Sequence, residues 1–190
     1  MLQIYYTKNM KKLLWIILAL FTIEVLGIVG YYWLAAGYAG NATLTLSKYV
    51  GLNLWSCIAF GVMNLAIIVL FSIYSVHQKK LTHNLLGLLF CLCYLILSLC
   101  PHLPYESPVV TIHQIFAITL FVIMLLSGIS LYNKNAKLPR LICGIFILFG
   151  LHFIFAYANH LPYFMDGILY WEVGYIYLYL ISLITCSASN

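Results

Sequence analysis

Charged residues are scarce in this sequence. Only 7% of its 190 residues are Asp, Glu, Lys or Arg, whereas 65% are hydrophobic. A soluble domain has about 25% charged and about 45–50% apolar residues, so this chain has too few polar groups to cover a surface in contact with water. This composition excludes an ordinary soluble domain and indicates that lipid surrounds most of the chain.

Sequence motifs of common enzyme classes are also absent. The chain has no GxxxxGK[ST] phosphate-binding loop, no GxSxG, no HExxH and no two histidines at positions i and i+4. Its only acids are Glu24, Glu106, Asp166 and Glu172, too few for a site built from several carboxylates. We therefore expect no metal and no cofactor. Whether the chain is an enzyme stays open, although a non-enzymatic role is favoured.

Six long apolar runs dominate the sequence. A bilayer core about 30 Å thick is crossed by roughly 20 apolar residues in an α-helix. The runs predict transmembrane helices at about residues 13–36, 52–76, 85–100, 109–132, 141–158 and 168–186. We therefore predict an all-α fold, an integral membrane bundle of about six transmembrane helices, with residues 1–190 forming a single transmembrane domain.

Basic residues are distributed unevenly among the segments between these runs. Eight of the nine lie before the first helix or in the second and fourth connections, and only Lys48 lies elsewhere. Because loops rich in Lys and Arg stay inside the cell, both termini are predicted to be cytoplasmic, in a multi-pass protein of the cell membrane. These clusters account for the net charge of +5, so nucleic acid is not expected as a partner.

The acids and most histidines collect between mid-membrane and the outer surface. Glu24 lies near the middle of the first predicted helix, where a carboxylate costs roughly 2.5–3.5 kcal/mol unless it is paired or faces water. His113, His152 and Glu172 are its candidate neighbours by depth. These four residues form a candidate polar site. A buried Glu–His pair would also serve simply to hold two helices together.

Two predicted helices carry polar stripes. Asn53 and Asn64 lie in the second, and Tyr175 and Tyr179 follow Glu172 at helical spacing in the last. Such stripes face the bundle interior, because lipid offers no hydrogen-bond partner. The two asparagines and two tyrosines are therefore candidates for lining a pocket, or for joining helices.

A four-residue sequence occurs twice. His-Leu-Pro-Tyr stands at residues 102–105 and again at residues 160–163, and the same offset places Gln114 opposite Glu172. If this match is not a coincidence, the third and fourth helices repeat the fifth and sixth, as in the parallel repeats of some transporters. Such a repeat would place equivalent residues around one outward-facing pocket.

Two groups of residues carry a resemblance to known membrane proteins. They are residues 46–51 with Trp55, Ser56, Phe60 and Asn64, and then Pro101, Pro104, His113, Ala117, Phe121 and Glu172. With these residues the chain resembles bacterial six-helix membrane proteins of undefined function and, more distantly, the DRAM-like (Frag/Sfk-type) family. The resemblance covers most of the chain after residue 45. It implies a role in membrane-lipid handling or regulation, with His113 and Glu172 as candidate site residues.

These features are compatible with more than one function. The first is an accessory or regulatory membrane protein that binds a lipid or a partner membrane protein through an outward-facing polar pocket. The alternative is a small membrane enzyme or proton-coupled transporter whose intramembrane Glu and His residues transfer protons. A third is a subunit that is stable only within a larger membrane complex. The expected partners are the lipid bilayer and a bound lipid or membrane protein.

Overall fold

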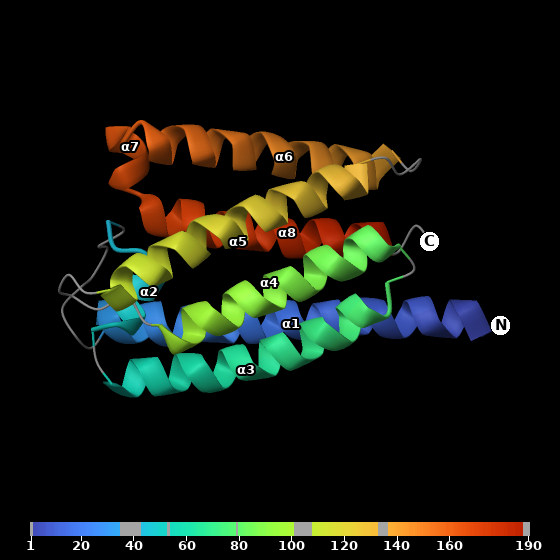
Figure 1. The fold of residues 1–190 in the computed structure, drawn as a ribbon, viewed down its shortest axis with the longest axis horizontal. Helices are drawn as coiled ribbons and strands as arrows, with labels where there is room; N and C mark the ends of the chain where they lie inside the picture. The colour runs from blue at the N-terminus through green and yellow to red at the C-terminus, as the bar shows by residue number, and fades with distance from the viewer. Residues whose placement is uncertain are drawn as a thin grey trace.

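The computed structural model of the chain describes residues 2–34, 43–52, 54–78, 80–100, 108–132 and 137–187. These residues form helices and no strand, which confirms the predicted all-α class. The long helices are α1 (Leu2–Leu34), α3 (Leu54–Val76), α4 (Leu81–Leu99), α5 (Pro108–Tyr132), α6 (Lys137–Ala158) and α8 (Ile168–Ser187), and the short ones are α2 (Leu46–Val50) and α7 (Pro162–Met165) (Figure 1).

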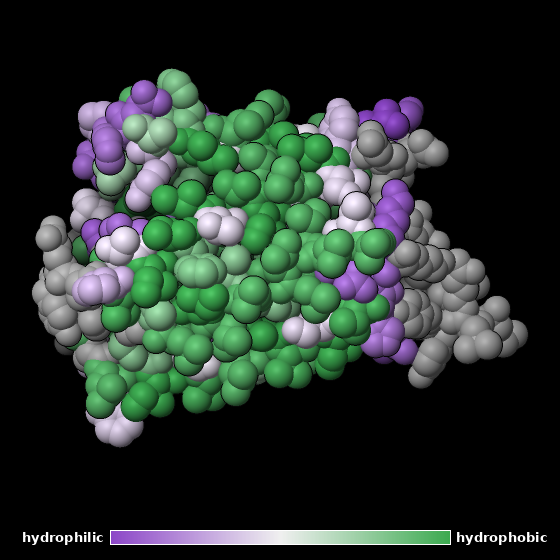
Figure 2. Space-filling model, viewed as in Figure 1, coloured by the Kyte–Doolittle hydropathy of each residue, from purple (hydrophilic) through white to green (hydrophobic). Residues whose placement is uncertain are grey.

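Six helices in the described part of the chain are long and apolar enough to cross a membrane. Figure 2 shows a broad hydrophobic band between two more hydrophilic ends. Helices are stable in hydrocarbon because the backbone N–H and C=O groups of each helix bond to one another. The six apolar helices therefore indicate a multi-pass membrane protein, as the composition predicted.

Several helix boundaries differ from the predicted ones. The helices predicted at 85–100 and 141–158 begin four residues earlier, at Leu81 and Lys137, and α1 extends back to Leu2. The apolar runs mark only the part of a helix in hydrocarbon, whereas helical hydrogen bonding continues through the polar residues beyond it. The short helices α2 and α7 were not predicted, because neither is long enough to show a periodic pattern.

The long helices form a closed ring. Each packs on the next one along the chain, and α8 packs back on α1. Two side chains of α8, Tyr175 and Tyr179, are buried in the centre, and the ring of Tyr179 lies 5.6 Å from that of Phe90 on α4 and 5.7 Å from that of Phe146 on α6. Helix α8 thus joins opposite parts of the bundle.

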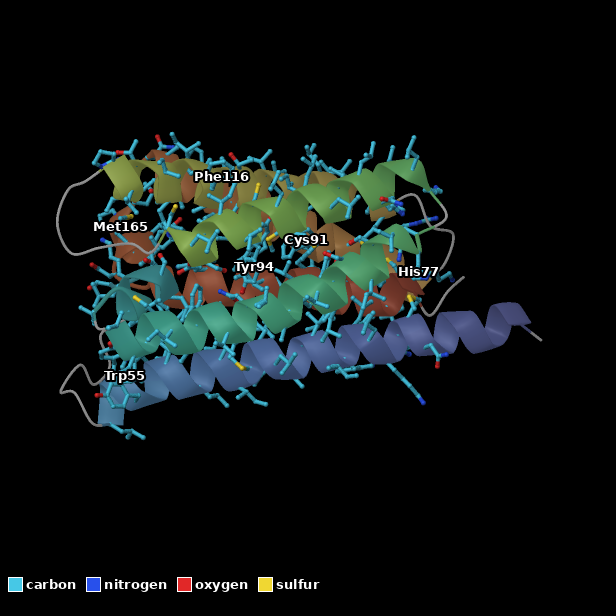
Figure 3. The ribbon with its side chains drawn as sticks, turned by 60° about the horizontal axis from the view of Figure 1, so that its bottom comes forward. Trp55, His77, Cys91, Tyr94, Phe116 and Met165 are labelled. Carbon is cyan, nitrogen blue, oxygen red and sulfur yellow. The ribbon has the colours of Figure 1, made fainter. Side chains whose placement is uncertain are left out.

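The two ends of the bundle differ in charge. The basic end has Lys11, Lys12, Lys80, Lys137 and Arg140, and Figure 1 shows both chain termini there. The other end, here called the capped end, has α2, α7 and a single described basic residue, Lys48. Figure 3 shows His77 toward the basic end, and Trp55 and Met165 toward the capped end.

Close packing of α3 on α4 depends on a glycine. A Cβ atom added at Gly87 of α4 would lie 2.7 Å from the Cβ of Ser75 on α3 and closer still to its Oγ. By contrast, a Cβ at Gly61 of α3 would meet no atom within 4 Å. Small residues of this kind let membrane helices approach each other closely.

We predict that Gly87→Ala lowers the thermal stability of the purified protein, whereas Gly61→Ala does not. Forcing an extra methyl group into a packed site costs typically about 1–3 kcal/mol, because neighbouring side chains or backbone must shift. The measurement is thermal unfolding in detergent, followed by circular dichroism. Equal midpoints for the two variants would contradict the close approach of α3 and α4.

Candidate functional site

A pocket of about 480 Å³ lies at the capped end. Helices α5, α6 and α8 form its walls, and residues from α2 and α7 border it. Its polar lining consists of Thr45, Ser47, Lys48, His113, Gln114 and Glu172, and its apolar lining includes Ala117, Ile118, Phe121, Val122, Phe153 and Ile154. Figure 1 shows that α5 and α6 are close together at the basic end and diverge toward the capped end.

The polar groups of the pocket all lie in its outer part, where they stand beside Tyr157, Ala158, Met165 and Ile168. Helix α5 begins at the capped end, so His113 and Gln114 lie nearest that end and Val122 lies about 12 Å further into the bundle. The side chains of Ile118 and Val122 on α5 and of Ile154 on α6 are all exposed on the bundle surface. The outer part of the pocket therefore contains all of its polar groups, whereas its inner part is apolar and opens between α5 and α6 toward lipid.

Glu172 attaches α2 to the bundle. Its Oε2 accepts a hydrogen bond of 2.7 Å from the backbone N–H of Leu46, the first residue of α2. Thr45 caps the same helix, because its Oγ1 accepts from the backbone N–H of Lys48 at 3.3 Å. Tyr49 is completely buried on the inner side of α2. These contacts hold Lys48 at the polar part of the pocket.

The histidine ring of His113 is oriented by the end of α4. Its Nδ1 lies 2.6 Å from the carbonyl oxygen of Cys100. Because a carbonyl oxygen only accepts, Nδ1 carries the proton and donates. The side chain is buried and lines the pocket that Glu172 also lines. The structure thus brings two of the four predicted site residues to one pocket.

His152 belongs to a different group of contacts. Its Nε2 is 3.1 Å from the hydroxyl of Tyr163 on α7, and its ring packs against those of Tyr163 and Trp171. These contacts join α6 and α8 to α7. His152 is thus not among the residues that line the pocket, and its contacts are those of an interhelical clamp.

Glu24 does not line the pocket that His113 and Glu172 share. It lines a groove between α1 and α3, and its carboxylate oxygens have no hydrogen-bond partner among the described residues. Asn64 of α3 is also buried and has no such partner among the described residues. Asn53 falls outside the described residues.

Tyr175 and Tyr179 are core residues. The hydroxyl of Tyr175 donates to the carbonyl oxygen of Phe121 at 3.3 Å, and that of Tyr179 donates to Ser127 Oγ at 3.3 Å. Both bonds join α8 to α5, so these side chains connect helices and do not line the pocket. Hydrogen bonding between helices was the other use that the sequence allowed for them.

The repeated His-Leu-Pro-Tyr sequence can be followed only in its second copy, because residues 101–107 lie outside the described part. Gln114 and Glu172, which the repeat makes equivalent, both line the pocket. That placement agrees with the pocket expected from a repeat, although the repeat itself stays a prediction.

The site has components that the sequence reasoning missed. Lys48 was read only as the exception to the charge distribution, and its place at the pocket follows from α2. The signal available was Thr45 before a short apolar segment, which is typical of a helix N-cap. Its anchor, Glu172, is 126 residues further along the chain. Among the described residues, no three His, Cys, Asp or Glu side chains are grouped so as to hold a metal ion.

Comparison with protein-family models, with curated proteins and with solved structures gives no match to this chain. The resemblance to the DRAM-like family therefore stays a prediction. What can be inferred about function comes from the geometry of the bundle.

We predict that Glu172→Ala detaches α2, whereas Glu172→Gln largely keeps it in place. The alanine variant leaves the Leu46 N–H without its acceptor, which costs about 1–3 kcal/mol, and glutamine still offers a carbonyl oxygen. Hydrogen exchange of the backbone amides of residues 46–50 measures the effect. Unchanged protection of these amides in Glu172→Ala would show that α2 is held by other contacts.

Proposed function

We propose that this protein is a non-enzymatic accessory or regulatory membrane protein that binds a phospholipid in the pocket at its capped end. The observation that carries the proposal is that the polar groups of that pocket are confined to its outer part, whereas its inner part is apolar and open to the bilayer. A membrane lipid has the same division between head group and acyl chain. No extraction from the membrane is needed, because the opening between α5 and α6 faces lipid.

The apolar part of the pocket suits an acyl chain. Phe121 and Phe153 form its inner wall, with ring centroids 4.7 Å apart, and Ala117 leaves space beside them. An acyl chain there would bury apolar surface against protein on one side and remain continuous with the bilayer on the other. Such a site selects an acyl chain by its shape, because an acyl chain is equally well solvated by lipid tails and by apolar side chains.

The polar part suits a phosphate-containing head group. Lys48 supplies a positive charge, and Thr45 and Ser47 supply hydroxyl groups beside it. Glu172 and Gln114 add acceptors suited to a hydroxyl or amine on the same head group. Because Lys48 is exposed, it reaches the phosphate layer of the membrane without leaving the pocket rim.

A proton-transfer function has less support from the geometry. A relay needs its groups within hydrogen-bond reach or one water apart. Glu24 lines a separate groove, and His152 is bonded to Tyr163. Only His113 and Glu172 share the pocket. The role in membrane-lipid handling that the DRAM-like resemblance implies agrees with lipid binding and is part of the same proposal.

The orientation of the bundle completes the proposal. The basic end would face the cytoplasm, because Lys and Arg are retained on that side during membrane insertion. The capped end, with the pocket and Lys48, would then face outward from the cell membrane. The phospholipid bound in the pocket would come from the outer leaflet.

We predict that Ala117→Trp sharply reduces the phospholipid that co-purifies with the protein. The indole would fill the apolar part of the pocket, whereas Ile115→Trp places the same side chain on the exposed face of α5 outside the pocket lining. Native mass spectrometry from mild detergent measures the bound lipid. We expect a loss of severalfold or more for Ala117→Trp and wild-type levels for Ile115→Trp. Equal lipid content in both variants, or co-purification of a membrane protein without lipid, would refute the proposed ligand.

We also predict that a membrane-impermeant amine reagent labels Lys48 in intact cells that express the chain. Lys80 and Lys137, at the basic end, should react only after the cells are lysed. Peptide mass spectrometry identifies the labelled lysines without any substitution. The opposite pattern would place the pocket on the cytoplasmic side.

A further inference from the structure

Helices α1 and α3 pack along matching buried faces. Their alignment is fixed near the capped end, where the hydroxyl of Tyr32 is 2.9 Å from Ser56 Oγ. Glu24 lies eight residues before Tyr32 on α1, and Asn64 lies eight residues after Ser56 on α3. Because α1 and α3 are antiparallel, both residues lie about 12 Å further into the bundle than the Tyr32–Ser56 pair. Glu24 and Asn64 therefore lie at about the same depth in the bundle.

Both side chains are buried and lack hydrogen bonds. Glu24 is 3% exposed and Asn64 0%, and among the described residues their side-chain oxygens and nitrogen have no hydrogen-bond partner. Buried polar groups are normally bonded, and each exception requires an explanation. In a membrane span an ionisable side chain is also costly to keep. The position thus calls for a partner that the chain itself does not supply.

The groove at Glu24 has room for such a partner. It has a volume of about 450 Å³ and is lined by Ile23, Glu24, Gly27, Ile28 and Tyr31 from α1 and by Trp55, Ser56, Ala59 and Met63 from α3. Ile23 is 60% exposed and Trp55 78%, so the groove opens on the lipid-facing surface, whereas the carboxylate oxygens of Glu24 are buried. Figure 3 shows Trp55 beside the end of α1, where the groove approaches the capped end.

The lining determines which ligand chemistry fits. Glu24 supplies an acceptor and a negative charge, and none of the nine lining residues is Lys or Arg, so an anionic ligand would be unpaired. Tyr31 and Trp55 offer aromatic faces, which attract cations. Tyr31 lies seven residues from Glu24 on α1, about 10 Å along the helix. The remaining lining is apolar or small, apart from the Ser56 hydroxyl.

We propose that the groove between α1 and α3 binds a lipophilic organic cation, an ammonium or phosphonium ion with apolar substituents, whose charge pairs with Glu24. The cation enters from the bilayer past Tyr31 and Trp55. Its substituents contact Ile28 and Met63. The site shares no residue with the lipid pocket, so it stands independently of the function proposed above.

The test uses tetraphenylphosphonium as the probe and the purified full chain in detergent, with binding measured by equilibrium dialysis. We expect saturable binding that Glu24→Gln weakens at least tenfold. Asp166→Asn is the matched control, because it makes the same change from acid to amide at an exposed position outside the groove, and it should bind as the wild type does. Equal affinity in wild type and Glu24→Gln would overturn the proposal.

A second measurement needs no variant to fold. A hydrophobic carbodiimide reacts with carboxyl groups that are reached from lipid, so it should modify Glu24 in the wild-type protein, and tetraphenylphosphonium should protect it. Peptide mass spectrometry reads the modification at Glu24. Modification that the cation leaves unchanged, or no modification of Glu24 at all, would contradict a lipid-facing cation site.

Discussion

Hydrocarbon offers no hydrogen-bond partner, and this constraint determines most of the structure. It keeps the backbone helical through six spans and confines the short helices α2 and α7 to one end of the bundle. It also accounts for hydroxyl side chains that bond to their own helix, as Ser75 does to the carbonyl of Phe71 and Thr119 to that of Ile115. Polar groups that cannot be satisfied in this way are therefore the ones that carry information about function.

Two carboxylates inside the bundle meet that constraint differently. Glu172 accepts a backbone N–H from Leu46 and thereby fixes a short helix at the rim of a pocket. Glu24 has no such bond and faces a groove open to lipid. Glu172 thus has a hydrogen-bond partner within the chain, and other polar side chains line the same pocket. Glu24 has room beside it and no described partner, which is why the two positions lead to separate proposals with different ligands.

The sequence predicted the six apolar helices well, because a bilayer imposes a minimum length that is readable residue by residue. It also placed His113 and Glu172 at similar depth, and the structure brings them to one pocket. Depth alone could not show that Glu24 lines a groove separate from the pocket of His113 and Glu172, since that depends on which helices are neighbours in the ring. Helix α2 was not predicted either: Thr45 is a typical N-cap residue, but the carboxylate that anchors the helix is distant in the chain.

The bond between Glu172 and Leu46 also affects the order in which the protein is made. Helix α2 leaves the ribosome long before α8, so during synthesis the N–H of Leu46 lacks its Glu172 acceptor until 126 more residues have been added. The same delay applies to the ring, which closes only when α8 reaches α1. The pocket is therefore among the last parts of the molecule to form. An incompletely inserted chain would expose α2 and the inner face of α1, and these are surfaces by which membrane quality control could distinguish unfinished molecules from complete ones.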